Sequence, residues 1–155
     1  MKMGTCICVQ VVEMNTNKMR GQIALVEFHD AVIDSLVLDM QGRCLVHFKH
    51  LPIYHERDRD NFEIWSYEAA LQLFDVRKIC VEGIGGAADY VSDMLSVGGD
   101  GDPLNSGRMP VDQRLSVSKV ELRFGSGRVA EIECGTMLLT LERATEHVED
   151  WAGPL

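Results

Sequence analysis

The chain has 155 residues, the size of one domain that can bury a core without disulfide bonds. Its 24 acidic and 15 basic residues give a formal net charge of −9, which argues against nonspecific binding to nucleic acid or to anionic membranes. A hydrophobic fraction of 46% with 25% charged residues excludes a disordered chain, a coiled coil and a collagen-like fibre.

Apolar and polar residues alternate through the first half of the chain, which is the pattern of β-strands. The apolar runs at residues 7–12 and 23–28 predict the first two strands. Residues 33–38 and 44–49 alternate on either side of Gln41-Gly42, which predicts a hairpin. Residues 69–73 and 79–81 predict two further strands.

The second half of the chain contains the one predicted helix. It covers residues 89–96, where apolar side chains form a one-sided stripe of about two turns. Residues 97–112 are rich in glycine, proline and aspartate and predict a long surface loop. Residues 120–124, 128–134 and 137–141 alternate again, and Gly125-Ser126-Gly127 predicts a turn between the first two.

The half-polar strands predict the fold class. Parallel strands are buried on both faces and are almost continuously apolar, whereas these strands keep one polar face and therefore indicate antiparallel sheets. Short strands joined by glycine-rich turns predict an all-β fold, either an antiparallel β-barrel or a barrel-like sandwich, with one short helix. No boundary or repeat divides the chain, so we expect a single β domain over residues 1–155.

The N-terminus and the cysteines predict a cytoplasmic protein. The first nine residues hold too short an apolar stretch for a signal peptide, and no run approaches the roughly 18 apolar residues of a membrane span. Five cysteines, most of them in apolar runs, indicate free buried thiols rather than disulfides. Cys6-x-Cys8 has no second close cysteine pair to complete a zinc site, and we predict no cofactor.

The densest polar segment, residues 47–60, contains three of the five histidines. Imidazoles beside carboxylates are ligands for zinc, nickel or iron. On a regular strand His47 and His50 point to opposite faces, so a shared metal requires a bulge, whereas Pro52 brings His50 and His55 together across a turn. The segment is therefore either a metal site of His47, His50 and His55 or a solvated polar strand end. Its binding candidates are His50, Tyr54, His55, Glu56, Asp58 and Asp60.

Other polar or aromatic positions have a functional and a structural interpretation each. The adjacent pair His29-Asp30 is either a proton-transfer pair or local turn chemistry. Trp65 lies in an aromatic stretch that forms either a recognition patch or the plug of a barrel end. Asp100 and Asp102 offer oxygen ligands in a glycine-rich loop, but their spacing does not match an EF-hand.

We predict no catalytic residue. Residues 83–88 match the G-x-G-x-x-A fingerprint of dinucleotide-binding proteins, but the antiparallel strands before it and the short helix after it argue against that function. No serine lies in a G-x-S-x-G elbow, and Cys44 and Cys134 lie in alternating strands as core thiols.

Two stretches carry a resemblance to a known group of proteins. The first is the Phe28-His29-Asp30 opening followed by the strand of residues 45–50 and by Tyr54-His55, and the second is the ending at residues 138–142 and 147–154. Both are similar to a group of small uncharacterised bacterial all-β proteins, and the opening resembles that of some predicted immunity proteins of bacterial toxin systems. The resemblance implies a β fold and a bacterial source, and it implies no activity and no catalytic residue.

We therefore expect a non-enzymatic binding protein, in its most specific form an immunity-type protein that neutralises a toxin. A net charge of −9 steers association with a basic protein partner, such as a nuclease. The expected contact residues are Asp58, Asp60, Asp100 and Asp102. The alternative is a small-ligand or metal-binding barrel that uses the histidines, and a homo-oligomer formed by exposed edge strands is a third possibility.

Overall fold

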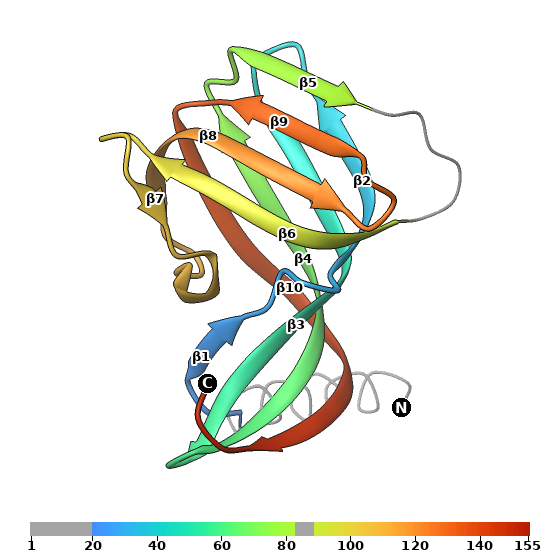
Figure 1. Ribbon diagram of the computed structural model, residues 1–155, viewed down its shortest axis with the longest axis vertical. Coiled ribbons are helices and arrows are strands. Elements are labelled where there is room, and N and C mark those ends of the chain that lie inside the picture. The colour runs from blue at the N-terminus through green and yellow to red at the C-terminus, as the bar shows by residue number, and fades with distance from the viewer. Residues whose placement is uncertain (1–19, 83–88) are drawn as a thin grey trace, which may run out of the picture.

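The structure is a computed structural model that describes residues 20–82 and 89–155. About two-thirds of these residues form antiparallel β-strands (Figure 1). The strands are β1 (Ile23–Val26), β2 (Val32–Leu38), β3 (Cys44–Asp58), β4 (Asn61–Phe74), β5 (Lys78–Glu82), β6 (Asp89–Gly98), β7 (Pro103–Leu104), β8 (Leu115–Phe124), β9 (Val129–Glu133) and β10 (Thr136–Ala152), and a single 3-10 turn, η1, covers Ser106–Arg108.

The strands close into a barrel-like sandwich, as the sequence predicts. The order along the main path is β5-β9-β8-β10-β4-β3-β2-β6-β7, and β6 also pairs with β8, which closes a ring. Two short junctions complete the ring: β2 pairs with β6 at Val32 and Ile33, and β10 pairs with β8 at Thr136 and Met137. β1 lies outside this path and pairs with β3.

The inward side chains of the strands fill one core. Phe48, Leu71, Leu122 and Leu139 come from four different strands, and each is almost completely buried. Burial of one such side chain stabilises the fold by roughly 1.5–3 kcal/mol. Cys44 and Cys134 lie in the same core as free thiols, and burial raises the pKa of each to about 11.

The three longest strands, β3, β4 and β10, continue past the sandwich and form a coiled ribbon at its lower end in Figure 1. β4 has 14 residues and β10 has 17, and three register shifts in the β10–β4 ladder accommodate the difference. The β3–β4 ladder contains two more register shifts. Each bulge increases the local twist, so the ribbon curls on itself.

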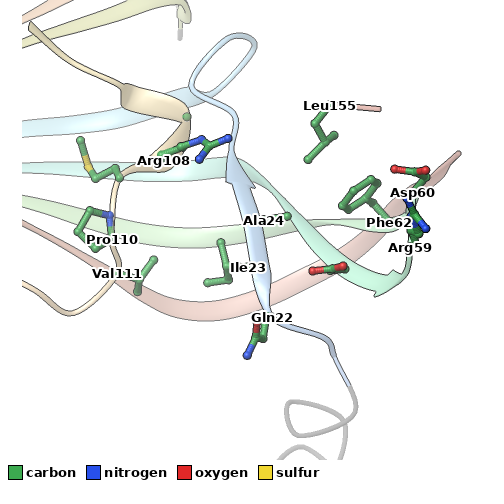
Figure 2. A pocket seen from close by; sticks show the side chains of 13 residues that line it. Gln22, Ile23, Ala24, Arg59, Asp60, Phe62, Arg108, Pro110, Val111 and Leu155 are labelled. Carbon is green, nitrogen blue, oxygen red and sulfur yellow. The ribbon is translucent and has the colours of Figure 1, made fainter. Parts of the chain in front are cut away.

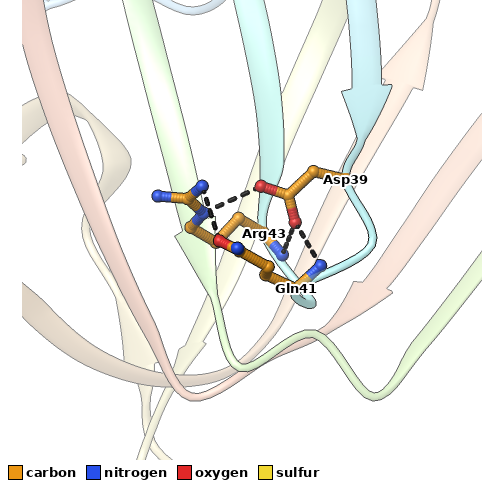
Figure 3. A network of polar contacts seen from close by, with 3 residues as sticks. All are labelled: Asp39, Gln41 and Arg43. Carbon is orange, nitrogen blue, oxygen red and sulfur yellow. Dashed lines mark hydrogen bonds and ion pairs between the residues drawn. The ribbon is translucent and has the colours of Figure 1, made fainter.

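The hairpin predicted at Gln41-Gly42 joins β2 to β3. The Asp39 carboxylate accepts hydrogen bonds from the backbone N–H groups of Gln41 (2.8 Å) and Arg43 (3.0 Å), and from Nε of Arg43 (2.8 Å) (Figure 3). These bonds lower the pKa of Asp39. Gly42 has a φ of 77°, a left-handed conformation that glycine adopts at little cost. The turn is therefore ordered by its own side chains.

The helix predicted for residues 89–96 is wrong, because this segment is strand β6 and pairs with β8. A bulge between Val91 and Asp93 places both Val91 and Met94 in the core although their separation is odd. The exposed side chains of Tyr90 and Leu95 complete a sequence pattern that imitates a helical stripe. The bulge, which residue types do not reveal, explains the error.

The long loop predicted for residues 97–112 is largely structured. β6 ends at Gly98, and its last residues pair with β7 (Pro103–Leu104) before η1 begins. Met109 is buried in the core, and the N–H of Asp112 donates to the C=O of Leu139 at 2.8 Å. The segment is therefore held in place by its contacts with β6 and β10.

Three predictions lie outside the described residues: the strand at residues 7–12, the Cys6-x-Cys8 pair and the glycine fingerprint at residues 83–88. In the ranges that are described, no helix has both the length and the apolar character needed to cross a membrane.

Replacing Met94 with alanine tests the strand assignment of β6. Met94 is 2% exposed and Leu95 is 41% exposed. We expect Met94→Ala to lower the free energy of unfolding by about 2–5 kcal/mol, and Leu95→Ala to lower it by less than about 1 kcal/mol. Urea titrations of the two variants measure both values. A helical stripe would bury both side chains, so equal losses would contradict the strand.

Candidate functional site

The three clustered histidines lie at three separate places along β3. A register shift between Phe48 and Leu51 shows a bulge at this point of the strand, so both of these residues face the core and His47 and His50 both lie on the outer face. His55 lies in the coiled ribbon and is buried. The sequence prediction that His47 and His50 need a bulge to share a face is therefore met, but each histidine has partners of its own.

His47 lies between two carboxylates on the outer face. Its Nδ1–H donates to Oδ1 of Asp34 on β2 at 2.6 Å, and its Nε2 is 3.4 Å from Oε2 of Glu142 on β10. The small side chain of Ala70, which is opposite His47 on β4, leaves room for the contact with Glu142. The hydrogen bond to Asp34 is the main cause that raises the pKa of His47. The arrangement favours the imidazolium form.

His50 faces Ser66 on β4. Its Nδ1 lies 2.5 Å from Oγ of Ser66, and these two residues line a cavity of about 370 Å³ together with Thr145. A serine beside a histidine is the arrangement of a nucleophile and its base. Ser66 is buried, however, and its backbone C=O accepts a hydrogen bond from the Thr145 hydroxyl at 3.2 Å. These contacts join the bulge of β3 at His50 and the bulge of β10 at Thr145 to Ser66 between them. The hydroxyls of Ser66 and Thr145 are both engaged in these contacts and are not presented to a substrate.

His55 is part of a buried polar group in the ribbon. Its Nδ1–H donates to the C=O of Gly21 at 2.8 Å, and its Nε2 accepts from the hydroxyl of Tyr67 at 2.8 Å. The guanidinium of Arg20 donates to the same hydroxyl at 3.3 Å and lies over the ring of Trp65 at 4.4 Å. Burial lowers the pKa of His55 and raises that of Tyr67. This neutral histidine ties the chain before β1 to the ribbon.

These positions give no support to a metal site at His47, His50 and His55. Within residues 20–82 and 89–155, no three histidine, cysteine or carboxylate side chains are placed to hold a metal ion. The bulge removes the difficulty of odd spacing, but each histidine bonds to different partners, and His55 is buried.

His29 and Asp30 form a turn before β2. Nδ1–H of His29 donates to the C=O of Ser92 at 2.8 Å, and Nε2 lies 3.6 Å from Oδ1 of Asp30. Asp30 has a φ of 69°. The bond to Ser92 joins this turn to β6. Both side chains are exposed, which agrees with the turn interpretation.

The four aspartates predicted as contacts lie on two different turns. Asp58 and Asp60 are at the β3–β4 turn at the lower end of the molecule, and Asp100 and Asp102 are at the β6–β7 turn beside the sandwich (Figure 1). Asp100 accepts from the N–H of Asp102 at 3.1 Å. The structure therefore does not combine the four residues into one surface.

Acidic side chains concentrate at the lower end. Residues 56–63 and 146–152 hold seven acidic side chains against two arginines, a net charge of −5 out of −9 for the whole chain. Arg57 lies 3.6 Å from Glu63 and 3.7 Å from Asp150, so it links all three strands of the ribbon. We call these seven side chains the acidic end: Glu56, Asp58, Asp60, Glu63, Glu146, Glu149 and Asp150.

A groove of about 730 Å³ opens beside the acidic end. Figure 2 shows Ile23 of β1 facing Pro110 and Val111 at one side of the groove, while Phe62 and Leu155 lie beside Asp60 at the other. Charged side chains also line the groove: Glu56, Arg59, Asp60 and Arg108. The groove thus combines an apolar floor with a charged rim, which is the composition of a recognition site.

Long-range contacts assemble this groove. The N–H of Gly153 donates to the C=O of Asp60 at 2.7 Å, and Trp151 is opposite Phe62, so the C-terminal residues reach the β3–β4 turn. The sequence analysis named Glu56 and Asp60 but missed Ile23, Arg108 and Leu155. No local pattern identifies these residues, because they come from distant segments. Tyr54 and Trp65 lie in the ribbon next to the groove rather than among its lining residues.

Comparison of the chain with protein-family models, curated proteins and solved structures found no match. The resemblance to immunity proteins stays a prediction.

Two of the histidines with shifted pKa values, His47 and His55, provide a test of the site geometry. The His47–Asp34 bond stabilises the fold fully below pH about 6.5, the unfolded value, and this contribution is lost as the pH rises through the folded pKa of His47. The contribution of neutral His55 is present above pH about 6.5 and is lost as the pH falls through its own folded pKa.

We expect NMR titration of the histidine ring protons to show a midpoint above 6.5 for His47 and one below 6.5 for His55. Asp34→Asn should return the His47 midpoint toward 6.5 and leave that of His55 unchanged. Identical midpoints for the two histidines in the unaltered protein would show that the described contacts do not form.

Proposed function

We propose that the chain is a non-enzymatic binding protein that takes a basic protein partner at the acidic end. The observation that carries the proposal is the net charge of −5 at the acidic end, beside a groove with an apolar floor. Charges of one sign beside a cleft raise the association rate of an oppositely charged partner, by about 10- to 1,000-fold at low salt. The apolar floor supplies the desolvated centre that such an interface needs.

The groove suits part of a protein better than a small charged ligand. Its rim offers two carboxylates, Glu56 and Asp60, for arginine or lysine side chains, and its floor of Ile23, Phe62 and Leu155 accepts an apolar anchor from the same partner. Arg59 and Arg108 add two donors for the backbone carbonyl groups of the partner.

In its most specific form, the proposal is an immunity-type protein that covers the basic surface of a toxin, such as a nuclease. The Phe28-His29-Asp30 opening, similar to that of predicted immunity proteins, supports this form. The free thiols of Cys44, Cys80 and Cys134 fit a bacterial cytoplasm, where thiols stay reduced.

Neutralisation of two carboxylates at the acidic end tests the proposal. We expect affinity capture from a lysate of the source organism to recover a basic protein whose binding weakens as salt is added. Asp58→Asn with Asp60→Asn should slow association with that protein by about tenfold at low salt. Surface plasmon resonance with the purified partner measures the rate.

The control is Asp100→Asn with Asp102→Asn, the same chemical change at the other turn. It should leave the association rate within about twofold, because electrostatic attraction falls off over roughly one Debye length. Equal losses in both double variants, or binding that salt does not weaken, would refute the acidic end as the contact surface.

A further inference from the structure

A second surface lies on the β2–β3 hairpin, at the opposite end of the molecule from the acidic end (Figure 1). Four large apolar side chains are exposed within nine residues of this hairpin. They are Val37 (55% exposed), Leu38 (52%), Met40 (103%) and Leu45 (40%). Val37 lies opposite Leu45 on one face of the hairpin, and Leu38, opposite the buried Cys44, lies on the other face, so these side chains flank the β2 edge on both sides. Grouped exposed apolar side chains mark an interaction site more often than single ones do.

The hairpin that presents these side chains is ordered. Asp39, Gln41 and Arg43 bond to one another around Met40 (Figure 3), so the turn holds Met40 in water without any contact that would bury it. An ordered turn loses little conformational entropy when a partner covers it. The ordered conformation of the turn therefore keeps Met40 exposed.

The outer edge of β2 is open next to this turn. Within the described ranges, β2 pairs with β6 only through Val32 and Ile33, so residues 35–38 have β3 on one side and no strand on the other. The N–H of Asp39 donates to the C=O of Arg43 at 2.9 Å. Hydrogen-bonded positions alternate along an antiparallel ladder, so the backbone groups of Leu36 and Leu38 point away from β3.

This edge lacks the features that protect the edges of β1, β7 and β10. β1 and β7 are only four and two residues long. The lower part of β10 carries three bulges and several acidic side chains. Residues 35–38 of β2, by contrast, are Ser-Leu-Val-Leu, without charge, proline or register shift. An edge of this kind pairs readily with another strand.

The edge is also complementary to itself. In antiparallel pairing about Leu36, the N–H and C=O of this residue meet those of Leu36 in a second copy, and Ser35 lies opposite Val37. No charge within residues 35–38 opposes a like charge. The flanking acidic side chains both have partners: Asp34, which would lie opposite Leu38 of the second copy, bonds to His47 at 2.6 Å, and Asp39 is 2.8 Å from Arg43. A net charge of −5 out of −9 lies at the far end, which reduces the repulsion between two copies that meet here.

We propose that a second copy of this chain docks on the β2–β3 hairpin, with the two β2 edges paired antiparallel about Leu36 and with Val37, Leu38 and Met40 covered. The resulting two-fold dimer is closed, because each copy uses its single β2 edge. Both acidic ends then point away from the junction and stay open to a partner. The proposal is independent of what the acidic end binds.

Sedimentation velocity of the full chain across the micromolar concentration range tests the dimer. We expect a species of twice 17.3 kDa at the upper concentrations. Val37→Lys and Met40→Lys should each weaken the dimer at least tenfold, because each places a charge in the covered surface. Met40→Lys should leave folding intact, since the Met40 side chain is fully exposed (103%).

The matched control is Val148→Lys, which adds the same charge at an exposed valine of β10 (44% exposed). It should leave the dimer intact. Hydrogen exchange adds a residue-level measurement: the amides of Leu36 and Leu38 should become protected as the concentration rises, while that of Val37, bonded to β3, is protected throughout. A monomer at all concentrations, or a dimer that Val37→Lys and Met40→Lys do not weaken, would overturn the proposal.

Discussion

The structure depends on a difference in length between neighbouring strands. β10 has three more residues than β4, and the two strands nevertheless pair from end to end. Each extra residue is taken up by a bulge, and a bulge bends and twists the strand that contains it. The long sheet therefore cannot stay flat, and its lower half coils into a ribbon. The acidic end, the groove and the buried His55 are all consequences of this coiling.

The bulges also decide which side chains meet on the outer face. The bulge in β3 brings His47 and His50 to one side, and Glu142, at a bulge of β10, reaches His47 across Ala70. Bulges redirect side chains in this way next to many functional sites. Here the result is a set of local polar contacts that hold three strands in register, while the open groove lies lower on the ribbon.

The two ends of the molecule differ in the charge and polarity of their exposed surfaces. Charges at the lower end, with a net charge of −5, keep the ribbon apart from other strands. At the upper end, the edge of β2 is uncharged and apolar, and the turn beside it is fixed by Asp39. A protein that used both ends would carry two partner sites on one dimer without competition between its two interfaces.

The sequence predicts those features that follow from local pattern. Alternation over residues 33–38 and 44–49 and the Gln41-Gly42 turn are sufficient for the β2–β3 hairpin, and the half-polar strands are sufficient for an antiparallel barrel-like fold. Bulges break the parity on which this reasoning depends. One of them made β6 resemble a helix through Val91 and Met94, and another placed His47 and His50 on one face.

The groove could not be predicted for a different reason. Ile23, Phe62, Arg108 and Leu155 are distant in the sequence, and they meet only after the ribbon has coiled. Glu56 and Asp60 were found because a run of charged residues is visible locally. Residues that meet only through long-range contacts therefore cannot be identified from the sequence, whereas a charged cluster within one turn can be.

The register of β10 against β4 provides the most direct test of the coiled ribbon. NOEs between backbone protons of facing residues measure this register. The structure predicts that Thr140 faces Ala70 above the three bulges and that Trp151 faces Phe62 below them. A ladder without bulges would instead bring Trp151 opposite Arg59. NOEs between Trp151 and Phe62 would support the coiled ribbon, and NOEs between Trp151 and Arg59, or unpaired lower strands, would contradict it.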